Sequence, residues 1–153
     1  MSFDAAAVLD MMARVTSHAQ RLGVFETVHT HEPKSAPGNG IHLAVWVQSI
    51  SPCSSGLSST SGRVELNARI YTSFIQKPED AIDPDILSAC AVLLNEWTGD
   101  FNFGTTLRMM DLLGAEGAPL SAKAGYIDID RKIFRVMTIV VPLIYNDMFA
   151  QVP

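Results

Sequence analysis

Apolar residues recur at helical spacing in the first part of the chain. In residues 3–22 they fall at steps of three and four positions and form one stripe. Acidic residues come early in this segment and basic residues late, as the helix dipole favours. The pattern predicts an amphipathic helix that ends at Gly23, where a left-handed cap residue is expected.

A second helix is predicted in residues 83–99. Asp83 is the expected N-cap, Pro84 the first helical residue and Gly99 the end. The residues expected on its buried face are Ile86, Cys90, Leu93 and Trp97, widened by Leu87 and Leu94.

Strict alternation of apolar and polar residues predicts strands in residues 41–50 and 63–75. In the second of these, Val64, Leu66, Ala68, Ile70 and Phe74 are expected to point inward, and Arg63, Glu65, Asn67, Arg69 and Tyr71 outward. Such regularity indicates an antiparallel pairing with one buried and one polar face. Residues 24–31 alternate without an apolar face, which is typical of an edge strand.

The last third of the chain predicts a β-hairpin in residues 125–144 that turns at 130–132. Its second strand is apolar on both faces after Val136 and should lie centrally, and Pro142 is expected to leave the ladder. Residues 105–113 are expected to form a further strand, and 32–40, 51–62 and 114–124 to form loops. The whole chain, 1–153, is therefore expected to be one α+β domain. It would have a mostly antiparallel sheet, an N-terminal and a mid-chain helix packed on that sheet, and extended loops and a hairpin available for oligomerisation.

Composition narrows the class of protein. With 153 residues and nearly half of them apolar, the chain can bury a proper core, and its longest apolar run is too short for a membrane span. The first residues lack the positive region of a secretion signal. A net charge of −5 with scattered basic residues argues against tight nucleic-acid binding. Cys53 and Cys90 are expected to be reduced thiols in a cytosolic setting.

Three groups of residues could carry chemistry, and in each a structural interpretation is favoured. His29 and His31 share a face, but two histidines without further ligands favour a solvated edge over a metal site. Asp128 and Asp130 resemble an acid–base pair, yet Asp130 begins a turn whose next residues are basic. The hydroxyls of residues 54–59 lack the strand–helix setting of a nucleophile elbow. No catalytic, cofactor or metal residues are therefore predicted.

Two aromatic residues lie on the less apolar faces of their strands. Trp46 and Tyr71 suit an interface anchor and a second-layer core about equally. We take them, with residues chosen for loop chemistry, as interface candidates: Pro37, Asn39, Trp46, Ser55, Leu57, Arg63, Tyr71, Asp128 and Arg131.

An ordered series of short segments carries a family resemblance. The series is Leu22-Gly-Val-Phe, His31-Glu-Pro-Lys-Ser-Ala-Pro-Gly-Asn-Gly, a Trp strand, Ser55-Gly-Leu-Ser-Ser-Thr-Ser-Gly-Arg-Val, Asn67-Ala-Arg-Ile-Tyr, Asp83-Pro-Asp-Ile-Leu, Asp111-Leu-Leu-Gly-Ala-Glu-Gly-Ala-Pro-Leu, Ala124-Gly-Tyr, Phe134-Arg-Val-Met-Thr-Ile and Val141-Pro-Leu-Ile-Tyr-Asn-Asp. In this order it resembles the tail terminator proteins of long-tailed bacteriophages, particularly those of actinobacteria, over nearly the whole chain.

The resemblance implies a structural virion protein and no enzyme. Its copies would form a hexameric ring that caps the head-proximal end of the tail tube, ends tube polymerisation and meets the head-closure or connector protein. DNA would only pass through the lumen, and the protein would be found in the host cytoplasm during assembly and in the virion neck afterwards. Two alternatives stay open: another neck or tail component, such as a head-closure or tail-tube protein, and a small α+β enzyme or ligand-binding domain.

Overall fold

The structure is a computed structural model that describes residues 5–53, 59–73, 79–99, 107–115 and 117–150. Its elements in chain order are α1 (Ala5–Arg21), β1 (Thr27–His29), β2 (Ile41–Cys53), β3 (Ser59–Ser73), α2 (Glu79–Gly99), β4 (Leu107–Met110), β5 (Ser121–Ile129) and β6 (Lys132–Ala150). Two helices and a mostly antiparallel six-stranded sheet make an α+β fold, as predicted.

The sheet has the strand order β1-β2-β3-β6-β4, and β5 also pairs with β6. All pairs are antiparallel except β1 with β2. Since β3 occupies one side of β6 along most of its length, β4 and β5 share the other side. β6 is therefore a central strand, as its two apolar faces predicted, and β1 lies at the opposite edge of the sheet.

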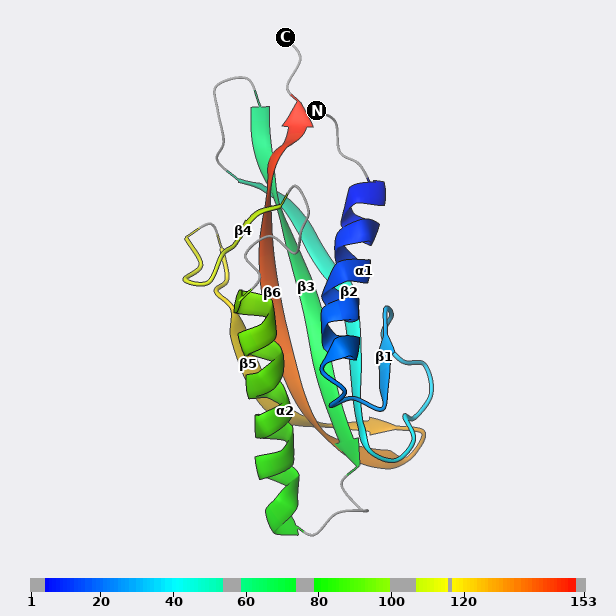
Figure 1. Cartoon of the computed structure of the whole chain (residues 1–153). Coiled ribbons are helices and arrows are strands. Elements are labelled where there is room, and N and C mark those ends of the chain that lie inside the picture. Colours follow the sequence, from blue (N-terminus) through cyan, green and yellow to red (C-terminus); the bar gives the residue numbers. More distant parts are fainter. Residues whose placement is uncertain (1–4, 54–58, 74–78, 100–106, 116, 151–153) are drawn as a thin grey trace.

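Both helices lie on one face of the curled sheet (Figure 1). Of the residues predicted to point inward from β3, Val64, Leu66, Ala68 and Ile70 are buried beneath them, together with the inner row Ile86, Cys90, Leu93 and Trp97 of α2. Phe74 lies outside the described residues. The indole Nε1 of Trp97 donates a hydrogen bond to the carbonyl of Val15, 3.2 Å away, and so joins α2 to α1. Leu87 was expected at this core, but 61% of it is exposed.

Two helix boundaries test the capping predictions. Helix α1 ends before Gly23, whose φ of +68° is the left-handed conformation expected of the cap. Helix α2, however, begins at Glu79 rather than after Asp83, and Pro84 lies inside it. Asp83 accepts a hydrogen bond from Nε of Arg135 on β6, at 2.9 Å, so its carboxylate serves the packing of the helix on the sheet.

Several strands are longer than their apolar alternation predicted. Residues 51–53 and 59–62, expected to be loop, extend β2 and β3, with Ser51 opposite Arg63 and Cys53 opposite Ser61. β5 likewise begins at Ser121, within a segment expected to be loop. Residues 121–124 are exposed, so only backbone hydrogen bonds hold them in the sheet. Their sequence has no apolar pattern that would indicate a strand. β1 and β4 are shorter than predicted.

Pro142 stays in the ladder, contrary to prediction. It lies opposite Glu65 of β3, and its carbonyl accepts a hydrogen bond from the backbone N–H of Asp111, 2.9 Å away, on the other side of β6. Because the N–H and C=O of one strand residue point to the same side, the missing N–H of Pro142 faces the β4 side, just beyond the end of β4 at Met110. The pairing with β3 therefore loses no hydrogen bond.

The second face of the sheet is partly covered, which corrects the prediction that Arg63 and Tyr71 face solvent. Tyr71 is 1% exposed and packs in a small second core with Ala44, Phe134 and Val136. Its ring meets Phe134 edge to face, with 6.4 Å between centroids. The β5–β6 hairpin curls across this face and covers Tyr71 (Figure 1). The alternation of residues within a single strand does not indicate such a contact.

Candidate functional site

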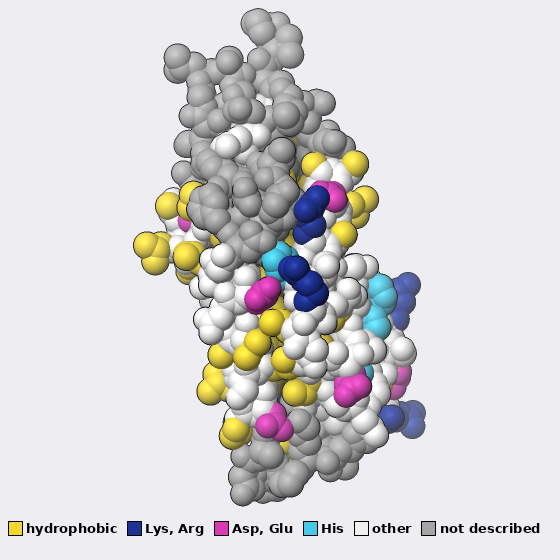
Figure 2. Space-filling model, in the orientation of Figure 1, with side chains coloured by type: hydrophobic (Ala, Val, Ile, Leu, Met, Phe, Trp, Pro, Cys, Tyr) yellow, Lys and Arg dark blue, Asp and Glu magenta, His cyan; other side chains and the backbone are white. Residues whose placement is uncertain are grey.

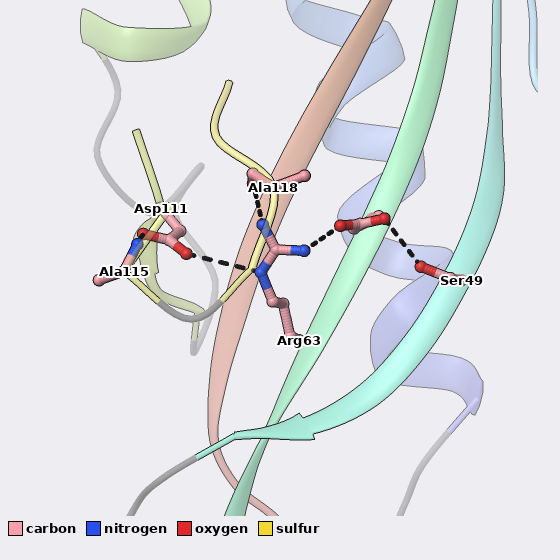
Figure 3. A network of polar contacts seen from close by, with 6 residues as sticks. Ser49, Arg63, Asp111, Ala115 and Ala118 are labelled. Carbon is pink, nitrogen blue, oxygen red and sulfur yellow. Dashed lines mark hydrogen bonds and ion pairs between the residues drawn. The ribbon is translucent and has the colours of Figure 1, made fainter. Parts of the chain in front are cut away.

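Arg63 is the centre of a buried polar cluster on the second face of the sheet. Its side chain is 2% exposed, although it was predicted to be an outward interface residue. Nη1 donates to Oε1 of Glu65, Nη2 donates to the carbonyl of Ala118, and Nε lies 3.5 Å from Oδ2 of Asp111. The guanidinium is thus contacted on three sides, by the carboxylate of Glu65 on β3 and by the carboxylate of Asp111 and the backbone of Ala118 in the loop that follows β4 (Figure 3).

Each carboxylate of this cluster has a second, neutral donor. Ser49 donates from its hydroxyl to Oε2 of Glu65 at 3.0 Å, and the N–H of Ala115 donates to Oδ1 of Asp111 at 2.9 Å. One positive and two negative groups are therefore held with polar partners for their outer oxygens, which offsets the cost of burying charge. We call the segment 111–120 the β4–β5 loop, and the cluster fixes its described residues, 111–115 and 117–120, on the sheet.

A glycine lets this loop approach the arginine. A Cβ at Gly117 would lie 2.8 Å from Cζ of Arg63, closer than a real side chain tolerates. The fixed loop presents two apolar side chains outward: Leu112 is 45% exposed and Leu113 is 93% exposed. Neither was predicted as a site residue. The only sequence signal is that two adjacent leucines follow Asp111 within a Gly/Ala-rich segment.

The chain neighbours of two predicted interface residues, Pro37 and Arg131, meet at the tip of the β5–β6 hairpin. The backbone N–H of Ala36 donates to Oδ2 of Asp130 at 2.9 Å, which places the segment around Pro37 against the hairpin tip. Asp130 and Arg131 have φ of 52° and 64°, so they form the two-residue turn that the hairpin needs. The prediction that Asp130 serves turn formation is confirmed.

The other interface candidates have different surroundings. Asp128 and Arg131 are exposed, as is Asn39, whose carbonyl contacts His42. Trp46 is half-buried, with the guanidinium carbon of Arg69 5.4 Å from its ring centroid. Ser55 and Leu57 lie outside the described residues.

Histidines take part in two polar clusters that were not predicted from the sequence. His18 on α1 is 8% exposed, and its Nδ1 lies 3.1 Å from Oε1 of Glu96 on α2 and 2.7 Å from Nη2 of Arg21. At the β1 edge, His29, His31 and His42 line one pocket with Thr27 and Lys34. Burial, and then the neighbouring His31 and His42, lower the pKa of His29 below its usual value of 6.5.

Other features of the described residues bear on the remaining function classes. Cys53 and Cys90 are both buried, and each is a reduced thiol, as predicted. Within the described ranges no group of three or more histidine, cysteine, aspartate or glutamate side chains is arranged to hold a metal ion. None of the helices there is both long and apolar enough to cross a membrane. A comparison with protein-family models finds none that matches this chain, and a comparison with curated proteins finds no similar one.

Proposed function

We propose that this chain is a structural protein of the phage neck, whose copies form a ring that caps the head-proximal end of the tail tube. The assignment to that position rests on the resemblance of the ordered segments to tail terminator proteins. The geometry supports the self-association that such a ring requires. In this function the ring ends tube polymerisation, contacts the head-closure protein and carries out no catalysis.

The observation that carries the proposal is the presence of two unlike apolar patches on one subunit. The first patch is Leu112 and Leu113 on the β4–β5 loop. The second is the outer face of α2, where Leu87 is 61% and Val92 41% exposed. Figure 2 shows exposed apolar side chains along α2 and, separately, on the loop at the left of the molecule. A ring closes through heterologous contacts, which need two different patches on each subunit.

The outer face of α2 is uncharged from residue 87 to 98, whereas Asp83, one turn before Leu87, is exposed and pairs with Arg135. The exposed side chains of this face from residue 87 to 98 are Leu87, Ser88, Ala91, Val92, Asn95 and Thr98. Surface helices of monomeric proteins normally carry charged residues on the side away from the core. Because the chain as a whole has a net charge of −5, an uncharged face lets two acidic copies meet without burying like charges.

The arrangement of the carboxylates favours this proposal over a small enzyme. Asp130 lies in a positive-φ turn and accepts the N–H of Ala36, so the conformation of the hairpin already uses one of the two oxygens. In the Arg63 cluster, the two oxygens of Glu65 accept from Arg63 and Ser49, and Oδ1 of Asp111 accepts from Ala115. Asp111 is also only 1% exposed, so it lacks the access to a substrate proton that a general base needs.

Light scattering and electron microscopy of the purified protein test the ring, alone and mixed with the tail tube protein of the same phage. We expect closed rings and an arrest of tube growth when the protein is added to polymerising tube protein. A tail-tube protein would instead extend into long tubes by itself. A protein that stays monomeric in both conditions and leaves tube length unchanged would contradict the proposal.

Two variants test the unlike contact. Leu113→Asp and Leu87→Asp should each abolish rings, since each removes one of the two patches. Mixed in equal amounts they should form heterodimers, because one intact pair of patches remains between them. Ser17→Asp, at an exposed position on α1, serves as the control that keeps the ring. Full rings in both patch variants would show that these patches are not the contact.

A further inference from the structure

The pocket at the β1 edge contains a chain of hydrogen bonds that fixes the protons on its histidines. It starts at His42, which is 5% exposed. Nε2 of His42 lies 3.0 Å from the carbonyl oxygen of Gly38 and 2.8 Å from that of Asn39. Carbonyl oxygens only accept, so Nε2 of His42 carries a proton. In the neutral ring Nδ1 is then an acceptor, and the hydroxyl of Thr27, 2.6 Å away, donates to it.

The same hydroxyl determines the tautomer of His29. Since the only proton of the Thr27 hydroxyl goes to His42, its oxygen accepts a hydrogen bond from Nε2 of His29, 3.1 Å away. Nδ1 of His29 therefore keeps its lone pair. In His31, Nδ1 lies 3.2 Å from the carbonyl oxygen of Glu32 and donates to it, which leaves the lone pair on Nε2. Two neighbouring imidazoles thus each have a free nitrogen lone pair.

The spacing of the two rings fits one metal ion. Their centroids are 5.3 Å apart. Two imidazoles bound at about 2.05 Å to a tetrahedral zinc ion place their centroids about 5.2 Å apart, whereas a 90° angle at the metal brings them to about 4.5 Å. We propose that His29 and His31 bind a divalent transition-metal ion with tetrahedral preference, Zn²⁺, at this edge of the sheet, through Nδ1 of His29 and Nε2 of His31.

The surroundings bear on how tightly the ion is held. Thr27 and the Glu32 carbonyl act as the outer hydrogen-bond partners that orient ligand imidazoles. Among the residues that the structure describes, these two histidines are the ligands, so water completes the coordination. Lys34 lines the same pocket, and its positive charge weakens the site, although its exposure to solvent screens that effect.

Titration calorimetry with ZnCl₂ on the tag-free protein at pH 7.5 tests the proposal. We expect one zinc ion per chain, and at least about a tenfold weaker association in each of the variants His29→Gln and His31→Gln. Lys34→Gln should bind zinc about twofold or more tightly, since it removes the repelling charge. His18→Gln, which alters a histidine between the two helices, should bind like the wild type. Far-UV circular dichroism checks that each variant is folded.

Nitrogen NMR of the imidazoles gives a second readout that does not depend on affinity. In the metal-free protein it should place the proton of His29 on Nε2, and zinc should shift the signals of His29 Nδ1 and His31 Nε2. The proposal is overturned if the double variant His29→Gln/His31→Gln binds zinc as tightly as the wild type. It is also overturned if His29 carries its proton on Nδ1. Neither result bears on ring assembly, which involves other residues.

Discussion

Nε of Arg63 lies 3.5 Å from Oδ2 of Asp111, and each of the two side chains is only 2% exposed. This relationship ties a central strand to the β4–β5 loop, and so determines where Leu112 and Leu113 stand on the surface. Removing the guanidinium would take away the positive group that lies beside the buried Asp111 carboxylate. The pair therefore has more effect on stability than a surface ion pair of similar length would have.

Replacing Arg63 by methionine should destabilise the protein by about 3–5 kcal/mol, because it removes the positive member of a buried ion pair. The free energy of unfolding from urea titration measures the loss. The double variant Arg63→Met/Asp111→Leu should recover part of it, since both charges are then gone. Arg14→Met, which breaks the exposed pair with Asp10, should cost less than about 1 kcal/mol. Similar losses in Arg63→Met and Arg14→Met would refute this account of the cluster.

The loop's approach to Arg63 can be tested at Gly117. A Cβ there would lie 2.8 Å from Cζ of Arg63, so Gly117→Ala must displace either the loop or the guanidinium. We expect a loss of about 1–3 kcal/mol in the free energy of unfolding, as in other overpacked sites. Gly38→Ala is the matched control, because a Cβ there would have no neighbour within 4 Å. Equal stability of the two variants would argue against the close approach.

Residue patterns could predict much of this fold because alternation and helical spacing report which residues face a core. The buried rows of β3 and α2 follow directly from them. The same patterns misplaced Arg63, because its partners Asp111 and Ala118 come from a loop far along the chain. They also missed residues 121–124, which are paired by their backbone but bury no side chain. Of the interface candidates, Tyr71 proved to belong to a second core that forms only once the hairpin curls over it.

Stability should fall in alkaline solution. Burial raises the pKa of Tyr145, with the nearby Asp10 as a second cause, and burial also raises that of Cys90. The unfolded chain loses these protons near the ordinary values of 10.0 and 9.0, whereas the folded chain keeps them to higher pH. The contribution of these groups is thus fully present below pH 9 and is lost as the pH rises through the raised values. Urea titrations from pH 7 to 11 should show this decline.

The variant Tyr145→Phe measures how much of this alkaline loss of stability is due to Tyr145. Among the described residues, the Tyr145 hydroxyl has no hydrogen-bond partner, so its removal should leave stability at pH 7 equal to or above that of the wild type. The decline above pH 9 should be shallower, because one ionisable group no longer has to stay protonated. An unchanged alkaline decline in this variant would mean that Tyr145 does not contribute to it.

The hairpin turn offers a stabilising substitution. Arg131 has a φ of 64°, a left-handed conformation that is sterically unfavourable for a residue with a Cβ. Its side chain is exposed, so no packing contact offsets this strain. Arg131→Gly creates the Asp-Gly pair that two-residue turns prefer, and it leaves the bond from Ala36 to Asp130 in place. We expect a gain of about 0.5–1 kcal/mol, read as a higher thermal midpoint. Lys132→Gly, one residue later at the start of β6, should lower the midpoint because strand residues favour negative φ. If both substitutions lower it, the strain assigned to Arg131 is absent.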